Sequence, residues 1–396
     1  MKLTSLTLAL ALTTTGTAYA DGLQRPVLPP PSGPAQVGTA SLRLVDPARH
    51  DPWKPEKPYR ELMVSVFYPA RDAERYPVAP HMLPGAAKAY DEFAGPGNAG
   101  VPTGLVDWAA TKTHSHVGAP VDLRGGPRPV VLYGAGAGDP RTWNTTAVED
   151  LASRGYLVVT VDHTYEAAGV EFPGGRVERT VLPELIPPEG PPPASLLRNT
   201  LTRRVGDLRS VLDRLPEIGV RVPGLLGAMD LGEIGVFGHS GGGFAALQTM
   251  HDDPRVKAAV NMDGLLSHTP EDTGDELSSV AADGVDRPFL LLGHERGGHH
   301  ARPSWNALWQ HSTGWRGDLL LRDSKHASFT DAEAIEPQLH GLPEPASERI
   351  GTVDPAAALA ANHAYVASFF DRFLRGVDDH LLDAPSPAHP DIDFVS

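Results

Sequence analysis

The sequence predicts an α/β fold with a mostly parallel central sheet and helices on both of its faces. Short, almost wholly apolar segments recur between residues 129 and 322, and glycine-rich turns or helical patterns separate them. Strands without polar alternation are buried on both faces, as parallel strands are when helices cover the sheet. The length of 396 residues suits one large domain, and no internal repeat is present.

Residues 1–20 have the pattern of a secretory signal peptide. Lys2 precedes an apolar run that ends at Leu12, and Ala18-Tyr19-Ala20 forms an Ala-x-Ala cleavage pattern. The apolar run is too short to cross a membrane. We therefore expect cleavage after Ala20 and a secreted, soluble protein without a transmembrane segment.

Charge and cysteine content exclude several classes of function. The net charge of −15 argues against nucleic acid and anionic lipid as partners. Because the chain has no cysteine, it has no disulfide, thiol nucleophile or cysteine-type zinc site.

The N-terminal third is expected to be irregular. Residues 21–37 are a proline-rich leader without a core of its own, and the domain proper spans 38–380. Strands are predicted at 41–45 and 62–68, followed by a mostly loop region over 70–126 with short helices at 85–93 and 104–111.

A regular alternation of strands and helices follows. A long helix over 197–215 carries an apolar stripe, and Asp354-Pro355 opens the last helix, which ends before Gly376. Residues 381–396 are expected to form a loose tail. The predicted strands are 129–133, 156–162, 234–238, 257–261, 288–292 and 318–322, with a helix over 145–153 between the first two.

Residues 163–194 interrupt this alternation and are predicted to be an insertion near the active site. Pro173-Gly174-Gly175 is typical of a hairpin tip, and the proline-rich run 187–193 is typical of a stiff loop. Because long insertions in compact domains usually carry function, we expect this one to cover or line the site.

The stretch Gly238-His239-Ser240-Gly241-Gly242 predicts a nucleophile elbow. An apolar strand precedes it and a helix follows, which is the setting of Gly-x-Ser-x-Gly in α/β-hydrolases. The glycines on either side of Ser240 are expected where a side chain would collide with a neighbouring strand or helix.

A serine nucleophile needs a histidine base that a carboxylate orients. His326 is the predicted base because it follows the strand 318–322 and lies after every plausible acid in the chain. Two acids are possible, Asp263 and Glu295, each after a buried strand. We favour Asp263 because it lies in a tight turn, whereas Glu295 is in a loop with charged and glycine neighbours.

The backbone N–H groups of Gly241 and Gly136 are the predicted oxyanion donors, with Ala135 and Ala137 as neighbours of the second. The side chain of His239 is expected to point away from Ser240 into the sheet. No metal site is expected, because the pairs His114/His116 and His299/His300 lack a carboxylate or cysteine at ligand spacing.

These motifs together resemble the platelet-activating-factor acetylhydrolase type of α/β-hydrolase. The resemblance rests on the elbow, on Met262-Asp263-Gly264 with the acid 23 positions after the serine, and on His326-Ala327-Ser328-Phe329-Thr330-Asp331. It extends from about residue 36 to 376 and favours Asp263 over Glu295. At the oxyanion loop the family's Ser-His-Gly-Leu-Gly is replaced by Tyr133-Gly134-Ala135-Gly136-Ala137, and the insertion also departs from the family.

The resulting expectation is a secreted serine carboxylester hydrolase of the esterase or lipase type. The catalytic triad would be Ser240, Asp263 and His326, and no cofactor is required. The expected partner is a small-molecule or lipid ester, and the protein is expected to be a monomer. The alternatives are a polyester- or cutin-type hydrolase and a non-catalytic binding protein on the same scaffold.

Overall fold

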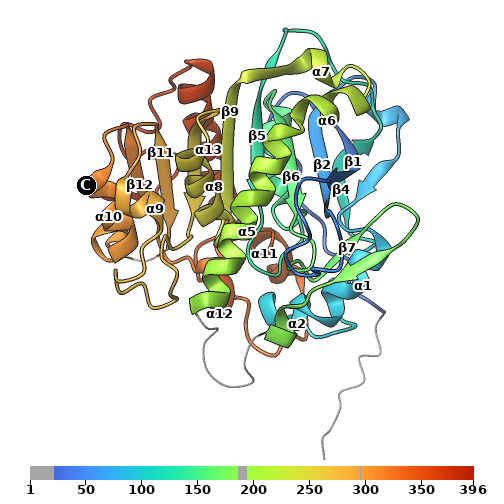
Figure 1. Ribbon diagram of the computed structural model, residues 1–396, viewed down its shortest axis with the longest axis horizontal. Helices are drawn as coiled ribbons and strands as arrows, with labels where there is room; N and C mark the ends of the chain where they lie inside the picture. The colour runs from blue at the N-terminus through green and yellow to red at the C-terminus, as the bar shows by residue number, and fades with distance from the viewer. Residues whose placement is uncertain (1–21, 186–193, 295) are drawn as a thin grey trace, which may run out of the picture.

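The computed structural model describes residues 22–185, 194–294 and 296–396, and an eleven-stranded sheet crosses it (Figure 1). The predicted signal peptide lies outside the described residues. Along the sheet the order is β13-β12-β11-β10-β9-β5-β6-β2-β1-β4-β3. The strands are β1 (Gln36–Asp46), β2 (Arg60–Ala70), β3 (Val78–Pro80), β4 (Lys112–Val117), β5 (Arg128–Gly134), β6 (Leu157–Asp162), β9 (Met229–His239), β10 (Val256–Met262), β11 (Phe289–Gly293), β12 (Arg316–Leu321) and β13 (Ile392–Phe394).

The six strands from β6 to β12 are parallel, as the apolar segments predicted. Their middle residues are fully buried, since helices pack on both faces. One face is covered by α5 (Ala194–Asp213), α8 (Gly241–Asp252), α9 (Ser279–Asp283) and α10 (Pro303–His311), and the other by α3 (Thr145–Ser153) and α13 (Pro355–Phe370). The fold is that of an α/β-hydrolase.

Helix α13 begins as its sequence predicted. The Asp354 side chain accepts a hydrogen bond from the N–H of Ala357 at 2.9 Å, and Pro355 occupies the first turn. Among the described residues, no helix combines the length and apolar character that a bilayer span requires.

The region 70–126 contains more strand than expected. It forms α1 (Pro84–Glu92) and α2 (Ala94–Asn98), but β3 and β4 extend the sheet and turns replace the helix predicted at 104–111. The inward side chains of β4 are Thr113 and Ser115, whose hydroxyls bond the Ala79 carbonyl and the Glu149 carboxylate. Because polar residues face inward, apolar alternation cannot reveal this strand.

The C-terminal residues 381–396 differ from the expected loose tail. Leu382 and Ile392 are buried, and β13 pairs antiparallel with β12 at the edge of the sheet. A three-residue strand is too short for a period-two pattern, so the sequence carries no signal for it.

The described part of the insertion is a hairpin and a short helix. β7 (Gly169–Glu171) pairs with β8 (Val177–Arg179), and α4 (Leu182–Leu185) follows. Gly174 and Gly175 have positive φ angles at the tip, as a hairpin turn there requires. The predicted proline-rich loop 187–193 lies outside the described residues.

Among the described glycines, the tightest fit against backbone atoms occurs where the end of β5 meets the start of α8. A Cβ atom on Gly242 would lie 1.9 Å from the carbonyl oxygen of Gly134, and one on Gly238 would lie 2.4 Å from the carbonyl carbon of Gly242. Only residues without a side chain allow the helix to begin this close to the strand.

We predict that Gly242→Ala lowers the free energy of unfolding by about 3 kcal/mol or more, because a backbone oxygen cannot move aside as a flexible side chain can. Gly227→Ala is the matched control, since a Cβ there meets no atom within 4 Å. Denaturant unfolding of both variants measures the difference. Equal stabilities for the two variants would contradict the close-packing explanation.

Candidate active site

Ser240 occupies a strained turn between β9 and α8. Its φ and ψ angles are 54° and −122°, a region that residues with side chains rarely adopt. The turn is held by two backbone hydrogen bonds, from Ser240 N–H to the Met262 carbonyl at 2.9 Å and from Phe244 N–H to the Ser240 carbonyl at 3.1 Å. Strain of this kind is concentrated at functional sites.

The predicted acid and base meet beside this turn. Asp263 directly follows β10, and His326 begins a 3₁₀ turn (His326–Phe329) shortly after β12. The Nδ1 atom of His326 is hydrogen-bonded to Oδ2 of the buried Asp263. Ser240 and His326 line one cavity, at the carboxyl ends of the parallel strands. The alternative acid, Glu295, lies outside the described residues.

Three side chains converge on the Asp263 carboxylate. His294 Nδ1 lies 2.7 Å from Oδ2, in addition to His326, and Arg302 Nη2 donates to Oδ1 at 2.8 Å. Burial alone would raise the pKa of Asp263. The hydrogen bonds from His294 and His326 and the Arg302 charge outweigh burial and hold this pKa well below its usual range. The carboxylate therefore stays ionised and fixes the orientation of the His326 ring.

His239 does not lie as the sequence analysis expected. Its ring lines the cavity rather than entering the sheet, and its Nε2–H donates to the backbone carbonyl of His326 at 2.9 Å. The centroids of the His239 and His326 rings lie 4.5 Å apart. Burial, and then the neighbouring His326, lower the pKa of His239 to about 3, so its ring is neutral. His239 is the last residue of β9 and pairs with Met262, so its side chain lies at the carboxyl end of the parallel strands, beside His326.

The loop predicted to carry the second oxyanion donor lies beside Ser240. Gly136, Ala137 and Ser240 line the same cavity, and a Cβ on Gly241 would lie 3.9 Å from the Ala137 nitrogen. Within the described ranges, no acceptor binds the N–H groups of Gly136, Ala137 or Gly241. Backbone donors without partners beside a serine are what an oxyanion hole requires.

Asp139 is a site residue that the sequence did not reveal. It is buried in the wall of the cavity, and its Oδ1 accepts a hydrogen bond from Asn98 Nδ2 at 2.9 Å. Burial raises the pKa of Asp139 to about 6, although the Asn98 hydrogen bond and the Arg204 charge oppose the change. A single aspartate in a glycine-rich loop has no sequence signature. His294 and Arg302 were missed for the same reason.

The cavity has a volume of about 720 Å³. Within the described part of the chain, no lining residue comes from the insertion 163–194, and its role in covering or lining the site stays a prediction. The lining residues are Gly97, Asn98, Gly136, Ala137, Asp139, Trp143, His239, Ser240, His294, Ser324, Lys325, His326, Ala327, Thr330, Glu348 and Arg349.

Two groups of described side chains have ligand atoms close enough for a metal ion. Asp263, His294 and His326 form one, and the exposed trio Asp378, His380 and Asp383 forms the other. In the first, hydrogen bonds already join both histidines to the carboxylate, and Arg302 brings a positive charge to the same group. The geometry fits a hydrogen-bonded acid and base better than a cation site.

The fold and the arrangement of serine, histidine and aspartate define an α/β-hydrolase, and the comparisons narrow this class. No family model matches the chain. A probable 1-alkyl-2-acetylglycerophosphocholine esterase of Arthroderma benhamiae is 28% identical over 93% of this chain and 94% of its own length. A ferulic acid esterase from Streptomyces cinnamoneus is 38% identical, with a TM-score of 0.75 over 94% of this chain and 100% of that structure.

The chain belongs to the platelet-activating-factor acetylhydrolase-like α/β-hydrolases, and it is a carboxylester hydrolase. The resemblance inferred from its motifs is thereby confirmed.

The raised pKa of Asp139 predicts a specific pH dependence of stability. Between its usual 3.8 and about 6, the folded protein holds a proton that the unfolded chain releases, so this group reduces stability as the pH rises through that window. Asp139→Asn removes this loss. Between pH 4 and pH 7, we expect the free energy of unfolding of the variant to rise above that of the wild type by up to about 3 kcal/mol. Denaturant unfolding measures this difference.

Asp263→Asn is the comparison for this experiment, because the pKa of Asp263 is shifted in the opposite direction. Its stabilising contribution is present above the unfolded pKa and lost in acid, so its replacement should lower stability at pH 7. If both variants changed stability in the same direction at pH 7, the assignment of Asp139 as a destabilising buried carboxylate would be wrong.

Proposed function

We propose that the protein is a secreted serine carboxylester hydrolase that forms an acyl-enzyme on Ser240. The observation that carries this proposal is that His326, which is hydrogen-bonded to the buried Asp263, lines one cavity with the strained Ser240. The signal-peptide pattern of residues 1–20 supports secretion.

In this mechanism His326 Nε2 removes the proton from Ser240 as Oγ attacks the ester carbonyl carbon. Asp263 holds the Nδ1–H tautomer and stabilises the imidazolium that forms. The N–H groups of Gly241 and Gly136 donate to the oxyanion. Collapse of the intermediate breaks the ester bond, and His326 gives its proton to the leaving alcohol. Water activated by His326 then releases the acid and restores the serine hydroxyl.

For the substrate class we propose esters of aromatic carboxylic acids. The relative with 38% identity is named a ferulic acid esterase, whereas the relative named for an acetylglycerophosphocholine is 28% identical. In the cavity, Trp143 offers an apolar surface, and Asn98 and Asp139 offer polar atoms within the same wall. Such a lining suits a flat acyl group with a polar substituent.

We expect Ser240→Ala to keep the fold, while its esterase activity falls at least about 10⁴-fold, because only substrate binding and the oxyanion donors remain. A fluorophosphonate probe should label the wild type and not the variant. A wild type that neither reacts with the probe nor hydrolyses p-nitrophenyl acetate would instead support a binding protein on this scaffold.

Replacing the acid tests the triad independently of the nucleophile. Asp263→Asn should lower kcat by about 10⁴, since the amide holds the wrong tautomer of His326. Glu295→Gln should cost less than about tenfold, because His326 is already hydrogen-bonded to Asp263. Steady-state kinetics on p-nitrophenyl acetate measures both variants, and a reversed order would assign the acid to Glu295.

The substrate proposal is tested by comparing methyl ferulate, a 2-acetyl glycerophosphocholine and a polyester film under the same conditions. We expect the highest kcat/KM for methyl ferulate. Preference for the phospholipid or release of acid from the film would replace the aromatic substrate class and leave the serine mechanism intact.

A further inference from the structure

The loop that carries the predicted second oxyanion donor is anchored through its carbonyl groups. The carbonyl oxygens of residues 135 to 138 each accept a hydrogen bond. Arg204 Nη1 donates to the Ala135 oxygen at 2.6 Å and Nη2 to the Gly136 oxygen at 3.2 Å. Asn98 Nδ2 binds the Ala137 oxygen at 2.9 Å, and the N–H of Ala168 binds the Gly138 oxygen at 3.0 Å.

These anchors determine where the loop's N–H groups point. In a planar trans peptide, the C=O of one residue and the N–H of the next point in opposite directions. A donor on the Ala135 oxygen therefore directs the Gly136 N–H to the opposite side, and a donor on the Gly136 oxygen does the same for the Ala137 N–H. Both N–H groups lack an acceptor among the described residues, and both residues line the serine cavity.

Arg204 is itself held rigidly. It lies on α5, only 1% exposed, and its Nε donates to Glu166 Oε2 at 2.7 Å. The other oxygen of the buried Glu166 accepts a hydrogen bond from Trp53 Nε1 at 3.2 Å. With Nε directed to Glu166, both terminal nitrogens of the guanidinium remain for the loop.

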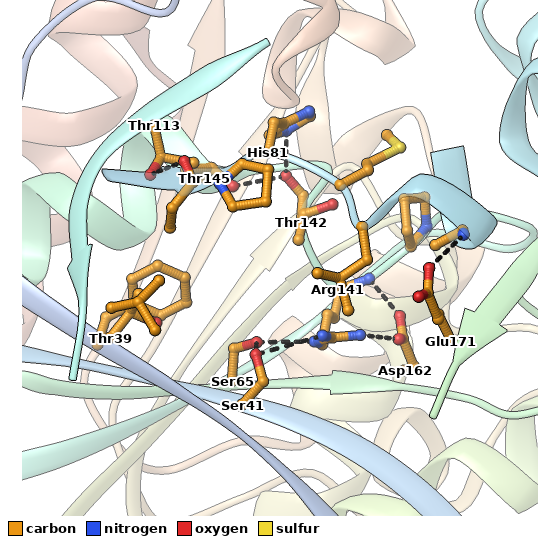
Figure 2. Close-up of a pocket in the computed structure, with 18 of the residues that line it drawn as sticks. Thr39, Ser41, Ser65, His81, Thr113, Arg141, Thr142, Thr145, Asp162 and Glu171 are labelled. Carbon is orange, nitrogen blue, oxygen red and sulfur yellow. Dashed lines mark hydrogen bonds and ion pairs between the residues drawn. The ribbon is translucent and has the colours of Figure 1, made fainter. Parts of the chain in front are cut away.

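The continuation of the loop is fixed by a separate arginine at a second cavity of about 260 Å³ (Figure 2). The backbone N–H of Arg141 donates to Asp162 Oδ1 at 2.7 Å, and its guanidinium lies between Asp162 and Ser65. The segment beyond Asp139 is thus held without Arg204. The Gly136 oxygen also accepts a hydrogen bond from the Asp139 N–H at 3.2 Å, but among the described side chains Arg204 is the one that binds both carbonyl groups, and the Ala135 carbonyl accepts from it alone.

We infer that Arg204 is a positioning residue, which holds the peptides from Ala135 to Ala137 so that their N–H groups meet the negative oxygen of the tetrahedral intermediate. It acts through the backbone and does not contact the substrate. This inference depends on the proposed acyl-enzyme mechanism. Because the oxyanion exists only in the transition state and intermediate, loss of Arg204 should affect kcat and spare KM.

The test compares Arg204→Met and Arg204→Lys with the wild type on p-nitrophenyl acetate. Complete removal of one oxyanion donor costs about 10²–10³ in kcat. We expect Arg204→Met, which misorients donors without deleting them, to lose about 10–10² in kcat with KM changed less than about threefold. Affinity for a phenylboronic acid, which forms a tetrahedral adduct with serine, should fall by the same factor as kcat.

Arg60→Met is the matched control. Arg60 is fully buried and paired with Asp51 and Asp207, but it has no hydrogen bond to the loop 135–139. The Arg60→Met variant should lose stability as Arg204→Met does. Its folded fraction should keep kcat and boronic acid affinity within about twofold of the wild type, because the loop 135–139 keeps its anchors.

If Arg204→Met does not fold, Arg204→Lys provides the test of the inference. Its ammonium group keeps the positive charge but cannot bind both carbonyl groups as the forked guanidinium does. Unchanged kcat and boronic acid affinity in a folded Arg204 variant would overturn the inference, as would an equal kcat loss in Arg60→Met. Failure of the wild type to react with a fluorophosphonate would instead overturn the proposed serine mechanism.

Discussion

The architecture of the site depends on a direct contact between two backbone segments, which is possible because glycines lie at the point of contact. The start of α8 lies so close to the end of β5 that a single Cβ on Gly242 would reach within 1.9 Å of a carbonyl oxygen. This contact fixes where the helix begins relative to the sheet. The residue between strand and helix, Ser240, must therefore adopt a positive φ that a serine otherwise avoids. Packing of the surrounding domain maintains this conformation.

Electrostatics sets the second constraint. Asp263 is buried, and a buried carboxylate without partners would take up a proton. Here the Arg302 charge and two imidazoles on the same carboxylate favour the ionised form. At His239 the neutral form is favoured instead, because burial lowers the pKa of its ring beside His326. The site thus combines an ionised carboxylate at Asp263 with a neutral imidazole at His239, and both side chains are hydrogen-bonded to His326.

The sequence predicted the parts of the molecule whose residues form a repeating local pattern. The apolar strands β5, β6, β9, β10, β11 and β12, the helix α3 and the elbow around Ser240 lie where expected. The pairing of Asp263 with His326 was also accessible, because chain order and strand-end position constrain it. Strand β4 was missed because its inward residues are polar, and β13 because it is too short.

What the sequence could not supply are contacts between distant loops. Arg204 lies on a helix that its apolar stripe predicts, but arginine on a helix is ordinarily exposed. Only the fold places its guanidinium against the carbonyls of Ala135 and Gly136. The same holds for Asp139, whose burial depends on α2 and the loop after β5.

The central claim is that ester hydrolysis passes through a covalent acyl group on Ser240. The most direct measurement is acid quenching during turnover of a slowly deacylating aromatic ester, followed by mass spectrometry of the digested protein. The account predicts an acyl group on the peptide that contains Ser240, which disappears when the substrate is exhausted. Turnover of the ester without any covalent adduct, or with an adduct on another residue, would contradict it.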